Sequence, residues 1–215
     1  MRLLLIRHGQ THGNVDARIQ GHDDPLTDLG SQQARITAEL LAARGDITHL
    51  YASPLDRAFE TARIIGAAIG LDPVPVAGLA EVNAGDATGM LWAEWTERFP
   101  DQAAVIRSHE RSLSHRWAGG ESGQDVADRV LAAYDELVTC HQGTDDVVAA
   151  VSHGGPLAWI SARVHGDPMD VWPSRRGIFG NCSISELDVD ARGHGEIVSW
   201  NQTGHLHGIE PAKDA

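Results

Sequence analysis

Five side chains spread along the chain are of types that can transfer a phosphoryl group. They lie at or after the ends of short apolar runs and are Arg7, His8, Arg57, Glu81 and His153. A phosphoryl group in transfer carries negative charge on its equatorial oxygens, so catalysis depends on positioning and electrostatic stabilisation. An arginine fork can bind two such oxygens, and a neutral imidazole can attack phosphorus. These residues predict a phosphate site that contains a nucleophile.

The two histidines are both chemically able to act as that nucleophile. We favour His8, because Arg7 and Gly9 on either side of it supply positive charge and a close approach of the backbone. His153 would then donate a hydrogen bond to the phosphoryl oxygens. Glu81 would protonate the departing alkoxide and later activate water.

Strands and helices alternate along the sequence. Apolar runs predict strands at 2–6, 49–52, 74–76, 146–151, 183–189 and 196–200. Helical spacing of apolar residues predicts helices at 27–44, 55–69, 122–140 and 155–165. This order predicts an α/β fold, a three-layer α/β/α sandwich with a mostly parallel central sheet. The most apolar run, 146–151, should be the central strand, and the proline in 74–76 places that strand at an edge.

This arrangement explains why the candidate residues should meet. In open α/β sheets, ligands bind beyond the carboxyl ends of the strands. Arg7 and His8 follow the first strand, and Arg57 lies in the first turn of a helix, whose N-terminus favours anions. His153 and Gly154 lie between the central strand and the next helix, so Gly154 is also expected to contact phosphate.

The middle of the chain, 90–117, is polar and should form a short helical flap. Its aromatic residues are expected to pack within the core or the flap, and they are Trp92, Trp95, Phe99 and Trp117. Three arginines should form a solvated helix face, with the alternative that one of them reaches the far end of the substrate, and they are Arg107, Arg111 and Arg116. No repeat or linker divides the chain, so 1–215 is expected to be one domain with a polar tail at 201–215. His205 and His207 of that tail should be solvated.

Composition excludes several classes of protein. The 215 residues carry a formal net charge of −13, which disfavours nucleic acid and anionic membranes as partners. No apolar run approaches the roughly 20 residues that span a bilayer. The apolar start is too short for a signal peptide, so the protein is expected in the cytoplasm. Cys140 and Cys182 lack metal-type spacing and should be reduced thiols.

The 12 histidines raise the question of a metal. His8 and His12 are four apart but in a predicted loop, and no HExxH pattern occurs. We therefore expect no metal and no cofactor. The expected partner is a small-molecule phosphate ester, and homo-oligomer formation is left open.

Four ordered segments resemble the histidine phosphatase superfamily, in its phosphoglycerate-mutase-like branch. They are RHGQT at 7–11, SPLDRAFETA at 53–62, GGES at 119–122 and VSHGG at 151–155. The resemblance extends from Arg2 to about Trp200. It implies a catalytic core of Arg7, His8, Arg57 and His153, with Glu81 as proton donor and a phosphohistidine at His8.

The resemblance also implies roles for two further residues, and at one position the sequence differs from the family pattern. Asn14 and Gln20 are implied as contacts of the phosphate or the leaving group, although both could be ordinary turn residues. Ala87 replaces an aromatic residue that is usual in the family. Glu81 keeps its spacing from the nearby glycines and so keeps its role, with Asp86 as the substitute.

Three functions are compatible with these residues. The first is a metal-independent hydrolase of phosphomonoesters, acting on small phosphorylated metabolites. The second is a cofactor-dependent phosphoglycerate mutase, an isomerase that returns the phosphoryl group to its substrate. The third is a non-catalytic module that binds phosphorylated ligands. The complete set of five residues argues against the module, and the short flap without a paired basic cluster argues against the mutase.

Overall fold

A computed structural model describes residues 1–108, 113–173 and 179–209. Its centre is a six-stranded sheet in the order β3-β2-β4-β1-β5-β6. The strands are β1 (Arg2–Arg7), β2 (His49–Ala52), β3 (Val74–Pro75), β4 (Val147–Ser152), β5 (Ile184–Val189) and β6 (Gly195–Gln202). β1 to β4 run parallel, whereas β5 pairs antiparallel with β1, and β6 pairs antiparallel with β5. The predicted mostly parallel sheet is confirmed.

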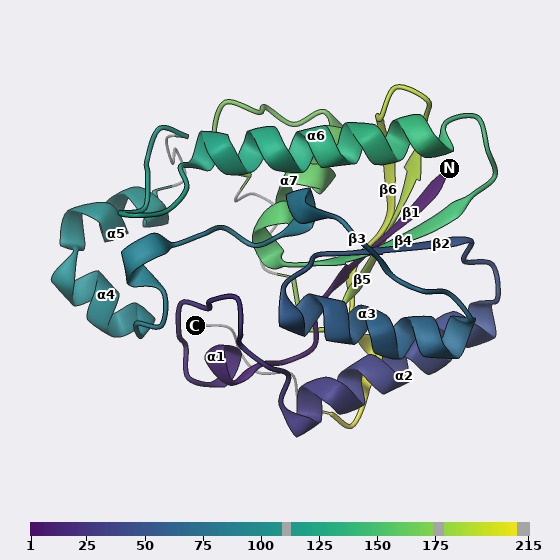
Figure 1. Cartoon of the computed structure of the whole chain (residues 1–215). Helices are drawn as coiled ribbons and strands as arrows, with labels where there is room; N and C mark the ends of the chain where they lie inside the picture. Colours follow the sequence, from purple (N-terminus) through teal and green to yellow (C-terminus); the bar gives the residue numbers. More distant parts are fainter. Residues whose placement is uncertain (109–112, 174–178, 210–215) are drawn as a thin grey trace.

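Helices cover both faces of the sheet, as Figure 1 shows. The helices on one face are α2 (Asp28–Arg44) and α3 (Asp56–Ile69), and those on the other are α6 (Gly123–His141) and α7 (Gly154–His165). Neighbouring side chains of a strand point to opposite faces. Leu4 and Ile6 of β1 therefore pack with α2 and α3, while Leu3 and Leu5 pack with α6 and α7. Two apolar cores result, which confirms the three-layer sandwich.

The sequence signals for strand and helix position agree with the structure. Every residue of β4 is buried, because β1 and β2 flank it and helices cover both its faces. Thr27 caps α2 by accepting a hydrogen bond from the Gly30 amide, and Gly45 ends that helix with φ at +71°. β3 lies at the predicted edge.

The predicted helical flap is present, but the expectation that helix continues to Trp117 is wrong. It contains α4 (Trp92–Arg98) and α5 (Pro100–Arg107), whereas residues 113–117 form a turn and an extended stretch. Arg116 is exposed as expected, but it pairs with Asp125 at 2.7 Å and lies on no helix. The Arg107 side chain and Arg111 lie outside the described residues.

The tryptophans hold the flap together. The Trp95 and Trp117 rings have centroids 4.9 Å apart, and the Trp92 ring lies 6.1 Å from that of Trp117. Trp95 is buried and also packs beside Phe99. The predicted packing role of these side chains is confirmed.

The described part of the tail, residues 201–209, is more structured than its polar composition suggested, and residues 210–215 lie outside the described residues. After β6, a short helical turn η4 (Gly204–Leu206) places the buried Leu206 against Ala34 of α2. His205 lies 3.0 Å from the Thr37 hydroxyl, and burial lowers its pKa, so the expectation of a solvated side chain is wrong. His207 is exposed as expected. The apolar contact of Leu206 explains the docking of this segment.

Three further short elements lie in the segments that follow β1 and β3. A four-residue helix α1 (His12–Val15) follows β1 and was not predicted. Short 3₁₀ turns η1 (Ala77–Leu79) and η2 (Gly85–Ala87) lie between β3 and the flap.

Cys140 and Cys182 are both free thiols. Within the described residues, no helix is long and apolar enough to cross a membrane.

Candidate active site

A cavity of about 440 Å³ lies beyond the carboxyl ends of β1 and β4. Seven of the eight predicted site residues line it, namely Arg7, His8, Asn14, Gln20, Arg57, Glu81 and Gly154. The eighth, His153, is fully buried behind this lining, with its ring centroid 5.1 Å from that of His8. The parallel strands therefore bring together residues that are up to 147 positions apart in the sequence.

His8 has a defined proton arrangement. Its Nδ1 lies 2.7 Å from the Gly9 carbonyl oxygen, which can only accept a hydrogen bond. The proton therefore resides on Nδ1, and Nε2 keeps a lone pair. Burial, followed by the charges of Arg57 and Arg7, lowers the His8 pKa well below its usual value. His8 is thus neutral near pH 7 and able to attack an electrophile through Nε2.

Two buried guanidinium groups supply positive charge beside His8. Arg57 is 1% exposed and donates to the Gly21 carbonyl at 2.6 Å, while Arg7 donates to the Phe179 carbonyl. The Arg57 Nε has no hydrogen-bond partner within the described part of the chain. A buried donor without a partner costs about 1–3 kcal/mol, and an oxyanion beside Arg57 would offset that cost.

His153 is held by a residue that the sequence analysis did not single out. Its Nε2 lies 2.7 Å from the Ser53 hydroxyl oxygen, which also accepts a hydrogen bond from the Leu55 amide. If the Ser53 hydroxyl donates to Nε2, the His153 proton lies on Nδ1, which is buried and has no partner among the described residues. Burial and then the Arg57 charge lower the His153 pKa. Ser53 opens the block at 53–62, and that place was its only sequence signal.

Glu81 reaches the cavity from the loop after β3. One carboxylate oxygen accepts from the Val82 amide at 2.9 Å, and the other lies 3.4 Å from the Gly155 amide. A Cβ on Gly155 would lie 2.5 Å from Glu81 Oε1, so this glycine permits the close approach to α7. Asp86, the substitute acid, does not line the cavity, and its amide bonds to the Ala118 carbonyl.

Asn14 and Gln20 differ in their surroundings. The Asn14 Oδ1 accepts from the Thr11 amide and from the Asn181 side chain, each at 3.1 Å. Asn181 also donates to the His8 carbonyl, and no sequence signal had indicated it. Gln20 lines the cavity, and its buried Oε1 has no partner in the described segments. Asn14 thus helps to shape the turn after His8, as the turn alternative supposed, and both residues face the cavity.

The outer wall of the cavity is largely apolar. Large apolar side chains of this wall come from the flap, from the segment after α7 and from the segment before β5, and they are Trp92, Ile106, Trp117, Trp172 and Phe179. Trp92 and Trp117 therefore line the cavity in addition to packing the flap. Arg18 adds a cation here and donates to the Gly89 carbonyl at 2.6 Å. Arg18 and Trp172 carried no sequence signal.

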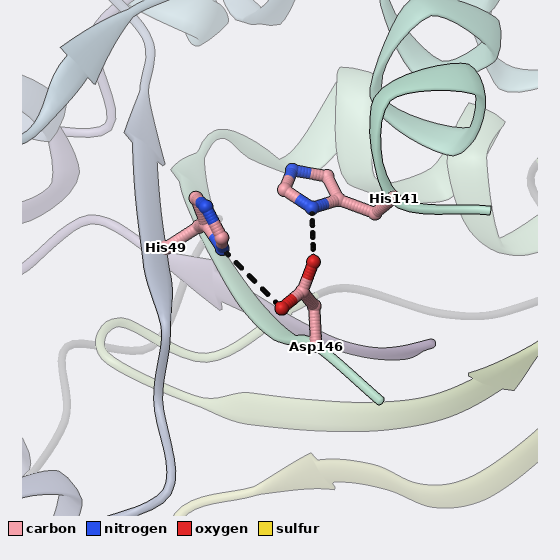
Figure 2. A group of neighbouring side chains, drawn as sticks. All are labelled: His49, His141 and Asp146. Atoms are coloured by element: carbon pink, nitrogen blue, oxygen red, sulfur yellow. Dashed lines mark hydrogen bonds and ion pairs between the residues drawn. The ribbon is translucent and has the colours of Figure 1, made fainter. Parts of the chain in front are cut away.

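Two histidine-aspartate groups elsewhere have metal-like proximity. One is His22, Asp23 and Asp56, all exposed, and the other is His49, His141 and Asp146. Figure 2 shows both histidines of the second group turned toward Asp146. His141 Nδ1 lies 2.8 Å from the Asp146 carboxylate, and its Nε2 lies 3.0 Å from the Tyr51 hydroxyl. Both ring nitrogens are thus engaged, and the group joins the end of α6 to the start of β4.

Known proteins resemble the chain over nearly its whole length. A glucosyl-3-phosphoglycerate phosphatase of Mycolicibacterium vanbaalenii is 39% identical over 202 residues, covering 91% of this chain and 87% of that protein. Phosphoglycerate mutase-like protein 4 of Arabidopsis thaliana is 33% identical over 208 residues, covering 95% and 86%. The solved structure of a mycobacterial glucosyl-3-phosphoglycerate phosphatase superposes with a TM-score of 0.81 at 32% identity, covering 94% and 99%.

The family comparison agrees with these relatives. The family described as histidine phosphatase superfamily (branch 1) matches residues 3–203. That span contains all four segments on which the sequence resemblance was based and every residue of the cavity. The chain belongs to the histidine phosphatase superfamily, branch 1.

Proposed function

We propose that this protein hydrolyses the phosphomonoesters of small metabolites through a phosphohistidine at His8. The observation that carries the proposal is the neutral His8 ring, whose Nε2 lone pair is free while Arg7 and Arg57 flank it. A site that only bound phosphate would need the cations but not this unprotonated nitrogen. The non-catalytic alternative is therefore disfavoured.

In the first step, Arg7, Arg57 and the Nδ1–H of His153 bind the phosphoryl oxygens. His8 Nε2 attacks phosphorus, the bond to the ester oxygen breaks, and Glu81 gives that oxygen a proton. The imidazole gains positive charge as the P–N bond forms. The Gly9 carbonyl stabilises this charge through its hydrogen bond to Nδ1–H.

In the second step, water replaces the alcohol. Glu81, now a carboxylate, takes a proton from water, and the water oxygen attacks phosphorus. The P–N bond breaks, which returns His8 to its neutral form and releases inorganic phosphate. Two displacements at one histidine thus hydrolyse the ester, with Glu81 acting first as acid and then as base.

The cavity supports a small metabolite as substrate. Its volume of about 440 Å³ exceeds what a phosphate group alone would fill. The apolar wall of Trp92, Trp117 and Trp172 would face the alcohol part of the ester. The mycobacterial relatives, by their names, act on glucosyl-3-phosphoglycerate, which is a phosphorylated metabolite of this class.

A mutase is the second candidate, because one relative is named as phosphoglycerate mutase-like. A mutase must retain its product and exclude water so that the other hydroxyl attacks the phosphoenzyme. Apart from Arg7 and Arg57, Arg18 is the single cation among the described residues that line the cavity. Arg18 is exposed and already donates to the Gly89 carbonyl, and the relatives that are named as phosphatases support hydrolysis as the first candidate.

We also propose that the enzyme acts in the cytoplasm on free small molecules. The net charge of −13 would repel nucleic acid and anionic lipid, and this supports a small-molecule partner that enters the cavity lined by Arg7 and Arg57. Arg7 and Arg57 line the cavity and are both buried, so they are placed to bind the phosphate group of a small molecule that enters it.

The experiment that tests the function compares two products. The purified enzyme is given a panel of phosphomonoesters, and inorganic phosphate is measured. In parallel, 2- and 3-phosphoglycerate are supplied with bisphosphoglycerate, and their interconversion is followed. We expect steady phosphate release from several esters and little interconversion. A mutase rate far above the phosphatase rate would show that the protein is an isomerase. If no ester were turned over, the non-catalytic binding module would be the remaining function.

A further inference from the structure

The GGES segment at 119–122 has no role in the mechanism above, yet its Glu121 holds Arg129 of α6. Arg129 Nε lies 2.7 Å from Glu121 Oε1, and one terminal nitrogen lies 2.9 Å from Oε2. Both side chains are 23% exposed. Two parallel hydrogen bonds between an arginine fork and a carboxylate fix the orientation of the guanidinium plane.

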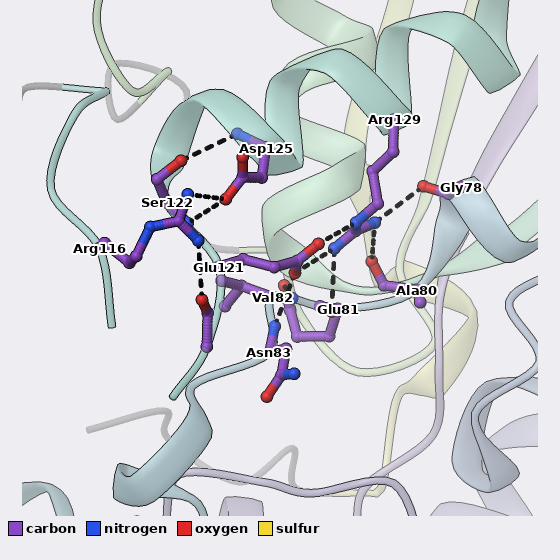
Figure 3. Close-up of polar contacts among 11 residues, drawn as sticks. Gly78, Ala80, Glu81, Val82, Asn83, Arg116, Glu121, Ser122, Asp125 and Arg129 are labelled. Atoms are coloured by element: carbon purple, nitrogen blue, oxygen red, sulfur yellow. Dashed lines mark hydrogen bonds and ion pairs between the residues drawn. The ribbon is translucent and has the colours of Figure 1, made fainter. Parts of the chain in front are cut away.

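The rest of the guanidinium faces the loop that carries Glu81. It donates to the carbonyls of Gly78 at 3.0 Å, Ala80 at 2.7 Å and Glu81 at 3.0 Å. Figure 3 shows Arg129 between Glu121 and these carbonyls. An arginine has five N–H donors, and the five bonds of Arg129 use them all. Every donor is thus committed either to Glu121 or to the loop.

Glu121 holds the same loop on its other side. Its Oε2 accepts from the Asn83 amide at 2.8 Å, and its own amide donates to the Asn83 carbonyl at 2.9 Å. Burial raises the pKa of Glu121, but the hydrogen bonds from Arg129 and Asn83 outweigh it and hold the pKa below its usual value. The ionised Glu121 carboxylate and the Arg129 guanidinium therefore hold the loop on both sides of Glu81. We call these two residues the clamp.

The sheet gives this loop limited support. β3 has two exposed residues, and Pro75 cannot donate to a ladder. The buried Ser152 hydroxyl holds the Leu79 carbonyl at 2.6 Å, which anchors the start of the loop. From Ala80 onward, the described backbone contacts of the loop come chiefly from Arg129 and Glu121. A general acid must lie within hydrogen-bond reach of its proton acceptor, so the loop position matters for catalysis.

We propose that Arg129 and Glu121 are positioning residues that hold the Glu81 carboxyl at the leaving oxygen. This proposal rests on the role of Glu81 in the proposed function. Neither residue lines the cavity, so both would act through the backbone of residues 78–83 and not by touching substrate.

The test compares the loss of activity on alkyl and aryl phosphates. An alkoxide needs a proton to leave, whereas nitrophenolate does not. Arg129→Lys keeps the charge but removes the fork, and Glu121→Gln removes the carboxylate. We expect each to lower kcat on an alkyl phosphate by about 10- to 100-fold, with less than about a threefold loss on p-nitrophenyl phosphate. KM should change little, because neither substitution alters the residues that bind the phosphate group, Arg7, Arg57 and His153.

Arg44→Lys is the matched control. Arg44 makes a similar two-bond pair with Glu186, at 2.9 and 3.0 Å, and is 26% exposed. Neither residue lines the cavity. This variant should lose a similar amount of thermal stability to Arg129→Lys, with the same small effect on both ester types.

Glu81→Gln separates the clamp from the acid that it serves. If Glu81→Gln loses alkyl and aryl activity equally, Glu81 is not the acid and the proposed role of the clamp is overturned with it. If Glu81→Gln is selective but the clamp variants are not, the clamp alone is overturned. When both are selective, adding Arg129→Lys to Glu81→Gln should cause no further loss on alkyl phosphates, since the positioned group is already absent. Should Arg129→Lys melt below the assay temperature, Glu121→Gln gives the same comparison.

Discussion

Ser53 and His153 form a buried hydrogen bond, with Ser53 Oγ 2.7 Å from His153 Nε2. Ser53 follows β2 and His153 follows β4, so the bond joins the carboxyl ends of two neighbouring parallel strands. It leaves Nδ1 as the ring nitrogen without a protein partner among the described residues. The pair therefore determines whether His153 offers a donor to the phosphoryl oxygens.

Ser53→Ala should weaken catalysis more than the loss of one buried hydroxyl would suggest. Without Ser53, the ring loses the partner of Nε2, and the tautomer is no longer selected. We expect kcat/KM to fall by about 100-fold, which is typical for the loss of one transition-state donor. Ser161→Ala is the control, since Ser161 is equally buried and its hydroxyl donates to the Leu157 carbonyl of the same helix at 2.7 Å. ¹⁵N NMR of the imidazole should show a tautomer change in Ser53→Ala alone, and an unchanged His153 spectrum would contradict this role.

The phosphoenzyme should carry its phosphate on Nε2 of His8. Nδ1 is committed to the Gly9 carbonyl, so attack through Nδ1 would first break that bond. Rapid quenching with labelled substrate should trap an acid-labile, base-stable label, and NMR of the phosphopeptide should identify the Nε2 isomer. His8→Ala should lose the label and turnover while its circular dichroism stays native. Label on Nδ1, or on a serine, would contradict the proposed attack.

Stability should fall as the solution is acidified below about pH 6.5, the usual pKa of histidine. Burial, followed by the nearby arginine charges, lowers the pKa of His8 and of His153 in the folded protein. Above pH 6.5, both states hold these rings neutral. Below it, the unfolded chain binds protons that the native state does not, so the free energy of unfolding decreases until the lowered folded pKa is reached. Urea denaturation from pH 8 to pH 5 measures this decrease, which should be shallower in His8→Gln.

A second decrease should follow at lower pH, near the usual aspartate pKa. Hydrogen bonds from His141 and then Thr144 lower the pKa of Asp146. The stabilisation is present above the unfolded pKa of Asp146 and is lost as the pH falls through the folded value. Asp146→Asn should remove this part of the pH dependence without changing kcat, because the group lies at the amino end of β4, opposite the cavity. An identical acid profile in the variant would contradict the assignment.

Gly155→Ala should displace Glu81 while leaving the fold intact. The new Cβ would meet Glu81 Oε1 at 2.5 Å, and the end of a glutamate side chain can move at low cost. An alanine inside α7 favours the helix, so the melting temperature should not fall. We expect about a 100-fold loss of kcat on alkyl phosphates and a much smaller loss on aryl phosphates. Unchanged alkyl turnover would show that Glu81 does not need its present position.

Activity should survive thorough chelation. Arg7 and Arg57 supply the positive charge that a divalent ion would otherwise provide at the phosphoryl group. Dialysis against EDTA, followed by the phosphate-release assay, tests this. Loss of activity that a divalent ion restores would show that the cavity, or the group around Asp146, needs a metal.

The sequence by itself determined the sheet and most of the site. The apolar runs defined β1, β2 and β4, and parallel strands place their carboxyl ends at one edge of the sheet. Strand order alone therefore predicts that Arg7, Arg57 and His153 lie in one cavity. The sequence also predicted where α2 begins and ends. Thr27 caps its first turn and Gly45 ends it in a left-handed conformation, and both features depend only on neighbouring residues.

Only the tertiary structure decided which side chains support that site. Asn181 and Trp172 come from segments without a motif, and the bonds of Arg129 to Glu121 and to the loop around Glu81 could not be inferred from the GGES motif or from the helical spacing that places Arg129. Their contacts join residues far apart in the chain, such as Arg129 with the Gly78 carbonyl and Asn181 with the His8 carbonyl. Such contacts depend on how helices and loops pack on the sheet. Strand order and local propensity constrain that packing but do not specify the individual hydrogen bonds.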